Sequence, residues 1–227
     1  MENRLFKSDE KKTRVFTCFL LCGLLLCSSL SAEMDIRKQE ERGDGKPLVL
    51  GLDKLILICE EFFSPFPEPD RKNFRMLKNR IVGVYGEFRR SYRPGHHHAG
   101  LDLEGWFNET VYSIGRGRVV RIFRTSPHQT IIIKHYLPDE KFLYSVYTHV
   151  EGIRVKIGDW VDENTALARL FNQTELEAAD FGTPNHLHLE IRKSFADRGR
   201  ASYASMSMEE LNRFCTDPEK FFRTHLR

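Results

Sequence analysis

The 227-residue sequence contains one long hydrophobic run, close to its N-terminus, and no second one. Because each membrane-spanning helix needs about 20 apolar residues, a polytopic membrane protein is excluded. Positive and negative charges are nearly equal in number, with 35 lysine and arginine residues against 32 aspartate and glutamate residues. A formal net charge of +3 therefore gives no reason to expect nucleic-acid binding. With 41% hydrophobic and 30% charged residues, the composition is that of a globular protein.

The first 32 residues show the order of segments found in a secretory signal. Basic residues precede an apolar run that ends at Cys27, and small residues follow up to Ala32. This order predicts a signal peptide over residues 1–32 and an exported protein of the periplasm or cell envelope. Two alternatives stay open: an uncleaved apolar anchor, or a lipid attached to Cys27. Either would place the protein at a membrane.

The rest of the chain divides by composition into an extension and a main body. Residues 33–79 are predicted to be a linker and N-terminal extension, charged at first, then apolar, then broken by three prolines. Residues 80–227 are predicted to be a mainly β domain with peripheral helices and a C-terminal helical tail, because short β-type runs alternate with Gly, Pro and Asp. A helix is expected at 207–214, where Ser207 and Glu210 form a capping box. Strands are expected at 119–123, 130–134, 142–147 and 186–191.

Cysteine is scarce in the mature chain. Of five cysteines, three leave with the predicted signal, and Cys59 and Cys215 remain. In an oxidising compartment these two can form a disulfide. The alternative is a pair of buried thiols, and the sequence does not decide between the two.

Two histidines lie on one predicted strand. In the segment 186–190, His-Leu-His-Leu-Glu, polar and apolar residues alternate, so His186 and His188 share one face of a strand. Two imidazoles held close together suit metal binding, or one metal ligand beside one catalytic base. Glu190 lies on the same face, where we expect an exposed acid over the alternative of a residue that supports the metal ligands from outside.

A second group of polar residues consists of His98 and Asp102, which lie four positions apart in the sequence. On an extended segment their side chains share a face, and Gly100 between them is expected to leave room for a metal ion and a bound water. Imidazole and carboxylate are good ligands for a divalent ion such as zinc. His149 ends another β-type run and supplies a further imidazole, although a single histidine at a strand end is more often structural.

Together these segments resemble the lysostaphin-like (LytM-type) zinc metallopeptidases, which cleave peptide cross-links in bacterial cell walls. The matching motifs are His-X-Gly-X-Asp at 98–102, Tyr-X-His at 147–149 and His-X-His at 186–188. The resemblance covers about residues 80–192. It includes a stretch at 86–89 that is similar to the family's Gly-X-Arg, with one extra residue before Arg89.

The resemblance implies an antiparallel β-sheet core of the LytM/lysostaphin type with a catalytic zinc site. His98, Asp102 and His188 would bind one Zn2+, and a water would take the fourth position. His149 and His186 would be the catalytic residues, with His186 favoured as the base. The implied activity is that of an exported zinc endopeptidase acting on peptidoglycan, with no nucleic-acid partner.

Two other functions stay open. One is a catalytically silent module of the same fold that binds and activates another cell-wall hydrolase. Such relatives have usually lost ligands or catalytic histidines, and all five positions are filled here, which favours the enzyme. The other is a metalloendopeptidase that acts on proteins outside the wall. A helical zinc protease is excluded, because the sequence has no His-Glu-X-X-His motif.

The sequence departs from the family pattern just before the His-X-His motif. Residues 171–179 are predicted to form an altered loop beside the site, which we expect to affect substrate choice more than metal binding. The basic residues from Arg192 to Arg200 are expected to form a solvated loop, and His135 has a structural or a substrate-cleft role. Surface or loop positions are expected for His96, His97, His128 and His225. Packing roles are expected for Phe62, Phe63, Phe66, Phe221 and Phe222.

Overall fold

The structure is a computed structural model that describes residues 58–90, 95–138, 141–180, 183–195 and 207–227. The predicted signal peptide and the start of the N-terminal extension lie outside these residues. Within the described ranges, no helix has both the length and the apolar character needed to cross a membrane.

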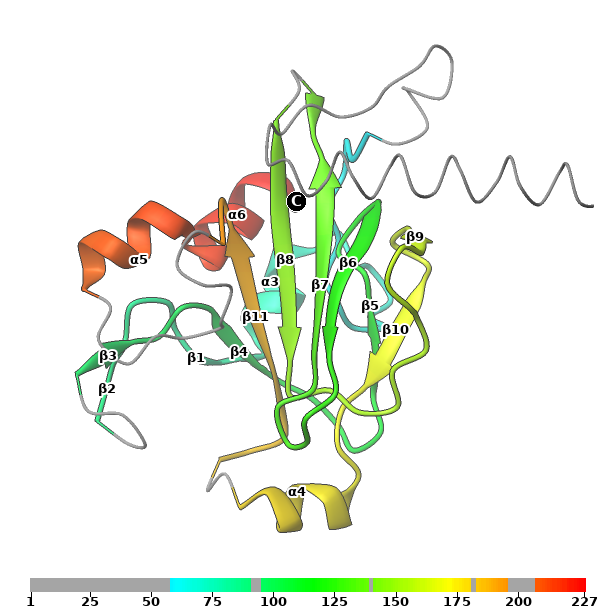
Figure 1. Cartoon of the computed structure of the whole chain (residues 1–227), viewed down its shortest axis with the longest axis vertical. Helices are drawn as coiled ribbons and strands as arrows, with labels where there is room; N and C mark the ends of the chain where they lie inside the picture. The colour runs from blue at the N-terminus through cyan, green and yellow to red at the C-terminus, as the bar shows by residue number, and fades with distance from the viewer. Residues whose placement is uncertain (1–57, 91–94, 139–140, 181–182, 196–206) are drawn as a thin grey trace, which may run out of the picture. The chain divides into compact units, whose positions relative to one another are not determined.

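An antiparallel sheet of eight strands forms the centre of the described chain (Figure 1). Its order is β1-β4-β11-β8-β7-β6-β9, and β12 pairs with β11 outside this path. The mainly β fold is confirmed, as are the four predicted strands, which are β6, β7, β8 and β11. The strands of this sheet are β1 (Ile81–Gly83), β4 (Leu101–Glu104), β6 (Gly117–Phe123), β7 (Thr130–Tyr136), β8 (Phe142–Thr148), β9 (Trp160–Val161), β11 (His186–Arg192) and β12 (Cys215–Thr216).

Among the residues that the structure describes, two small sheets and four short helices surround this sheet. The small sheets pair β10 (Ala166–Arg169) with β5 (Thr110–Tyr112), and β2 (Phe88–Arg89) with β3 (His96–His97). The helices are α3 (Phe74–Lys78), α4 (Gln173–Ala179), α5 (Met208–Phe214) and α6 (Pro218–His225). The predicted capping box starts α5, because the Ser207 side chain accepts from the backbone of Glu210 and the Glu210 side chain accepts from that of Ser207.

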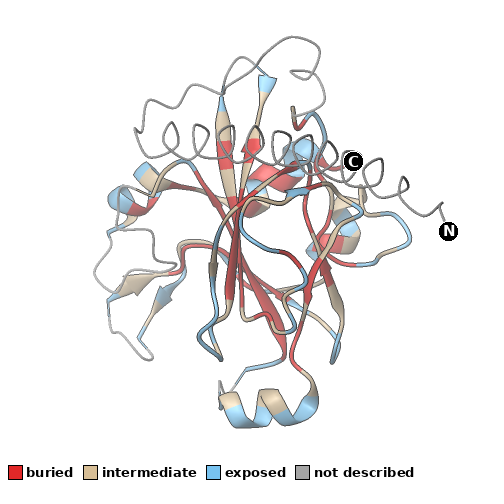
Figure 2. Cartoon of the chain, turned by 45° about the vertical axis from the view of Figure 1, so that its right-hand side comes forward, coloured by how far each residue is buried: buried red, intermediate tan, exposed pale blue. Residues whose placement is uncertain are grey.

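The two faces of the sheet differ in chemistry. Leu187, Leu189 and Ile191 of β11 enter the main hydrophobic core, together with residues of the neighbouring strands such as Ile133 and Tyr147. Because side chains alternate along a strand, the even-numbered residues of β11 lie on the opposite face. Figure 2 shows buried residues along most of the central strands, and all seven residues of β11 are buried. The apolar face of the sheet therefore packs in the hydrophobic core, and the opposite face carries polar side chains.

Residues from the predicted N-terminal extension and from the C-terminal tail cover the apolar face. Cys59, Phe62, Phe66 and Leu77 belong to the same core cluster as the sheet. The rings of Phe62 and Phe221 lie edge to face with centroids 4.8 Å apart. Of the five phenylalanines expected to pack, four are buried, and the fifth, Phe63, is half-buried. The hydrophobic core therefore extends to both sides of the predicted domain boundary at residue 80.

Hydrogen bonds hold residues 58–72 in place, although this segment contains no helix or named strand. One parallel bridge links Ile58 to Tyr136 of β7. The half-buried guanidinium of Arg71 donates to the carbonyl oxygens of Ser64, Ser113 and Glu163. These hydrogen bonds take the place of the regular backbone hydrogen bonds that a strand would form.

The prediction of a loop over 171–179 is wrong, because these residues contain α4. Asn172 caps the helix and forms a capping box with Glu175. No residue of α4 is buried, so the apolar periodicity that marks most helices is missing. The carbonyl of Phe171, just before α4, accepts a 2.9 Å hydrogen bond from the side chain of Asn185, which places α4 next to the start of β11 (Figure 1).

The two cysteines among the described residues, Cys59 and Cys215, are free and buried. Cys59 lies in the main core and Cys215 lies in a second cluster with Ala99 and Leu211. The alternative of two buried thiols is therefore confirmed over a disulfide. Burial raises the pKa of both thiols to about 12, so neither is a thiolate at neutral pH.

Candidate metal centre

The pairing of β4 with β11 brings two of the predicted ligands together. Asp102 lies directly opposite His188 in this antiparallel register, and residues directly opposite share a face. Close approach of the strands depends on Gly100, because a Cβ there would lie 2.5 Å from the carbonyl oxygen of Leu189. The expectation that Gly100 leaves room for a metal and water is wrong, since β11 takes that space.

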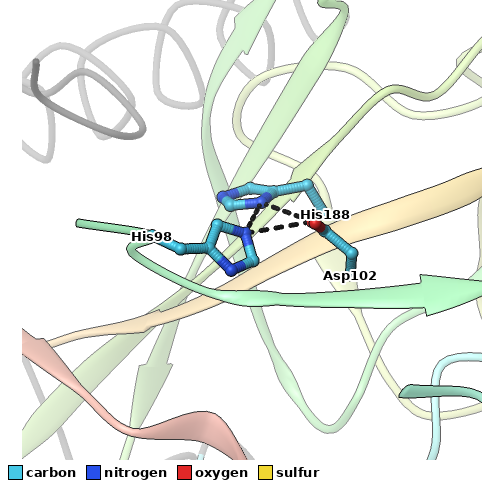
Figure 3. A group of neighbouring side chains, drawn as sticks. All are labelled: His98, Asp102 and His188. Carbon is cyan, nitrogen blue, oxygen red and sulfur yellow. Dashed lines mark hydrogen bonds and ion pairs between the residues drawn. The ribbon is translucent and has the colours of Figure 1, made fainter. Parts of the chain in front are cut away.

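His98 joins Asp102 and His188 from the segment just before β4 (Figure 3). Its Nε2 lies 3.0 Å from Oδ1 of Asp102 and 2.9 Å from Nδ1 of His188, and these last two atoms are 3.0 Å apart. All three residues are buried. A tetrahedral zinc ion with ligands at 2.0–2.2 Å separates them by about 3.3 Å. The three atoms are thus arranged almost as one face of such a tetrahedron.

Each of the two histidines is held by a second hydrogen bond. Nδ1 of His98 donates to the carbonyl of Val84 at 2.8 Å. Nε2 of His188 donates to Oε1 of the buried Glu190 at 2.9 Å. Since those nitrogens carry the hydrogens, the nitrogens that face Asp102 present lone pairs in the neutral rings. Three electron-pair donors converging on one point fit a metal ion, which this set of residues can hold.

The electrostatics also favour a positive charge at this point. Burial raises the pKa of Asp102, but hydrogen bonds from His188 and His98 outweigh it and hold that pKa well below its usual range. Burial lowers the pKa of His188, but its bonds to Asp102 and Glu190 raise it to about 9. Burial dominates at His98 and lowers its pKa. Two buried carboxylates thus stabilise a cation between them, whether a proton or a metal ion.

The other two predicted histidines lie beside this cluster. Nε2 of His186 is 3.8 Å from Oδ1 of Asp102, and its Nδ1 donates to the carbonyl of Pro184 at 2.8 Å. The ring centroid of His149 is 5.0 Å from that of His186 and 6.2 Å from that of His188. His149 has a left-handed backbone (φ 65°), which turns the chain at the end of β8.

Both of these imidazoles are neutral at pH 7. Burial lowers the pKa of His186, and the nearby carboxylate of Asp102 partly offsets this effect. Burial and the neighbouring His186 and His188 lower the pKa of His149 well below its usual value. A neutral imidazole can accept a proton, and His186 is the stronger base of the two because Asp102 stabilises its protonated form.

Comparison with protein families gives a match over residues 96–202 to Peptidase family M23. The matched stretch is just under half of the chain, and it is similar to the M23 peptidases. Among solved structures, the antimicrobial peptidase lysostaphin from Staphylococcus simulans has a TM-score of 0.50 and 18% identity, with 71% of this chain and 55% of that chain covered. Its catalytic domain gives a TM-score of 0.48 and 20% identity, covering 66% and 98%. LytU gives 0.45 and 22%, covering 64% and 85%.

These identities are low, so the structural likeness concerns the fold. It confirms the mainly antiparallel lysostaphin-type fold expected from the sequence. A search of curated proteins finds no match to this chain.

The burial of Glu190 and Arg192 differs from what the sequence predicts. Glu190 is completely buried, so the expectation of an exposed acid is wrong. Its Oε2 accepts from Nη1 of Arg192 at 2.9 Å, and Arg192 is itself 1% exposed rather than part of a solvated loop. Alternation along β11 correctly places Glu190 on the same face as His186 and His188. The sequence near Glu190 does not indicate that other residues cover this face.

Arg89 is a further polar residue at the site. It lies on β2, and its Nη2 is 2.6 Å from Oδ2 of Asp102, the carboxylate oxygen that does not face the histidines. The resemblance to the family's Gly-X-Arg stretch includes Arg89, but it assigns this residue no role at the site. Arg89 lies 13 positions before Asp102 in the sequence. It belongs to the small sheet of β2 and β3, whereas Asp102 belongs to β4 of the eight-stranded sheet.

The remaining histidines of the described residues have separate roles. His135 is fully buried on the core side of the sheet, where it binds the carbonyl of Arg116 and the hydroxyl of Ser145, so its role is structural. His128 lies 5.2 Å from His149, centroid to centroid, and is therefore more than a surface residue. His96 and His97 form β3 instead of a loop, and His225 stacks on Phe221.

Proposed function

We propose that the protein is a zinc-dependent endopeptidase that hydrolyses peptide cross-links of bacterial peptidoglycan. The observation that carries this proposal is the convergence of Nε2 of His98, Oδ1 of Asp102 and Nδ1 of His188 within 3.0 Å of one another, beside two further imidazoles. A silent module would not need all five side chains in one place.

His98, Asp102 and His188 would hold the zinc ion. When bound, zinc lowers the pKa of water to near neutrality and polarises a carbonyl group. The protein contributes the orientation of the three ligands through Val84, Arg89 and Glu190, each of which holds one of them from outside. Such outer hydrogen bonds keep ligands in one tautomer and one rotamer.

The catalytic steps then fall to His186 and His149. His186 donates from Nδ1 to Pro184, so its Nε2 is the atom that accepts a proton from the attacking water. His149 lies within 5.0 Å of His186, centroid to centroid, and serves the other side of the scissile bond, at the carbonyl oxygen or the leaving amine. Burial keeps both rings neutral before the reaction begins.

The proposed place of action is the cell envelope. Residues 1–32 would direct export, and a retained anchor or a lipid on Cys27 would keep the protein at a membrane. Residues 33–47 would act as the linker at the start of the N-terminal extension.

Digestion of purified, cross-linked peptidoglycan tests the proposal, with mass spectrometry of the released fragments. We expect loss of cross-linked fragments with the zinc-loaded protein, and no loss with chelator or with His186→Ala. His97→Gln is the matched control, because His97 adjoins His98 but lies outside the ligand group, and it should cleave normally. Absence of cleavage by a folded, zinc-loaded protein would favour the activator module or a protein substrate.

A further inference from the structure

Arg89 holds the carboxylate of Asp102 from the side opposite the histidines. Its Nη2 is 2.6 Å from Oδ2, while Oδ1 faces His98 and His188 at 3.0 Å. The two oxygens of one carboxylate are thus divided between a guanidinium and the proposed metal position. Asp102 itself is 6% exposed, so water does not compete freely for either oxygen.

Gly83 provides the space in which this ion pair forms. A Cβ at Gly83 would lie 2.5 Å from Oδ2 of Asp102 and 2.6 Å from Nη2 of Arg89. Gly83 lies opposite Asp102 in the pairing of β1 with β4, so its position is fixed by the sheet. No side chain larger than hydrogen fits there while both charged groups keep their places.

We propose that Arg89 is a positioning residue that restricts Asp102 to binding the metal through one oxygen, and that Gly83 is required because it admits Arg89. A carboxylate that binds through both oxygens would occupy two coordination positions. An open position is what a catalytic zinc site needs for water. This inference rests on the zinc site of the proposed function.

The alternative is that Arg89 acts through its charge alone. A guanidinium close to a dication repels it, so removing this charge would then strengthen metal binding. Gly83→Ala keeps the charge and removes the space. The two explanations therefore predict opposite results for Arg89→Met and different results for Gly83→Ala.

The test uses the full chain loaded with zinc or with cobalt(II), whose optical spectrum reports coordination geometry. For Arg89→Met and Gly83→Ala we expect a changed cobalt spectrum and a zinc affinity about 10- to 100-fold lower, measured by competition with a chromophoric chelator. Arg90→Met is the control, since Arg90 is the adjacent, exposed arginine, and it should match the wild type.

Tighter zinc binding by Arg89→Met with unchanged Gly83→Ala would overturn the proposal in favour of the charge explanation. Unchanged spectra and affinities in both variants would overturn it as well. If Gly83→Ala does not fold, the Arg89 variant decides. A wild type that binds zinc but cleaves no peptidoglycan would contradict the proposed function and leave the positioning role standing, whereas a wild type that binds no metal would overturn both.

Discussion

Oε1 of Glu190 accepts a 2.9 Å hydrogen bond from Nε2 of His188, and both side chains are buried. The second oxygen of the carboxylate accepts from Arg192 at the same distance. Because Glu190 fixes the hydrogen of His188 on Nε2, Nδ1 is the nitrogen that faces Asp102 and His98. The carboxylate therefore selects the atom that His188 offers to a metal.

Glu190→Gln keeps the shape of this side chain and removes its charge. We expect zinc affinity to fall by about 10- to 100-fold, because the hydrogen bond to His188 weakens. The free energy of unfolding of the metal-free protein should fall by about 3 kcal/mol, because Arg192 stays buried without its counter-charge. Chelator competition and urea denaturation measure the two effects. Glu209→Gln is the control, since the Glu209 side chain is 88% exposed, and equal values for both variants would contradict the prediction.

Replacing the two proposed catalytic histidines should separate catalysis from metal binding. For His186→Ala and His149→Ala we expect kcat to fall by about 100- to 10,000-fold while one zinc per chain is retained. His188→Ala should lose the metal as well as the activity. Metal analysis of the purified variants, beside fragment release from peptidoglycan, checks this. Loss of zinc from His186→Ala would place that residue among the ligands instead.

His135 makes stability depend on pH. Burial lowers its pKa to about 4 in the folded protein, whereas an unfolded histidine titrates near pH 6.5. Between these values the unfolded chain binds a proton that the folded one excludes, so the free energy of unfolding falls as pH falls, by about 3 kcal/mol in total. Urea denaturation at several pH values should show a steeper fall for the wild type than for His135→Gln. An equal pH dependence of the free energy of unfolding in the wild type and in His135→Gln would contradict this prediction.

The two buried thiols should be reactive after unfolding and inert before it. With their pKa raised to about 12, Cys59 and Cys215 stay protonated and shielded in the native state. We expect iodoacetamide to leave both unmodified in buffer and to modify both in urea without any reductant, as read by peptide mass spectrometry. If both cysteines resisted labelling in urea until a reductant was added, they would be paired.

Local patterns in the sequence predicted the strands and the histidine face of β11. Runs of β-branched and aromatic residues mark β7 and β8, and strict alternation marks β11. The capping box of Ser207 and Glu210 correctly marked the start of α5. These signals each lie within a few residues and need no knowledge of the tertiary fold.

What the sequence did not predict depends on contacts between distant segments. Asn172 and Glu175 form the same kind of capping box as in α5, but α4 has no buried face to support a helix prediction. The contact of Arg89 with Asp102 depends on where β2 lies relative to β4. Whether Glu190 is exposed or buried depends on what covers its face of the sheet, and alternation along a strand carries no information about that cover.

The contact between Phe62 and Phe221 has a consequence for the length of chain that folds as one unit. The family match ends at residue 202 and begins at residue 96, whereas these two rings lie outside it on either side and meet beneath the sheet. A polypeptide trimmed to the matched stretch would lose Phe62, Phe66, Phe221 and Phe222 from the core cluster that contains Leu187 and Leu189. The part of the chain that forms the hydrophobic core is therefore longer than the stretch that the family model matches, and it includes residues on both sides of that stretch.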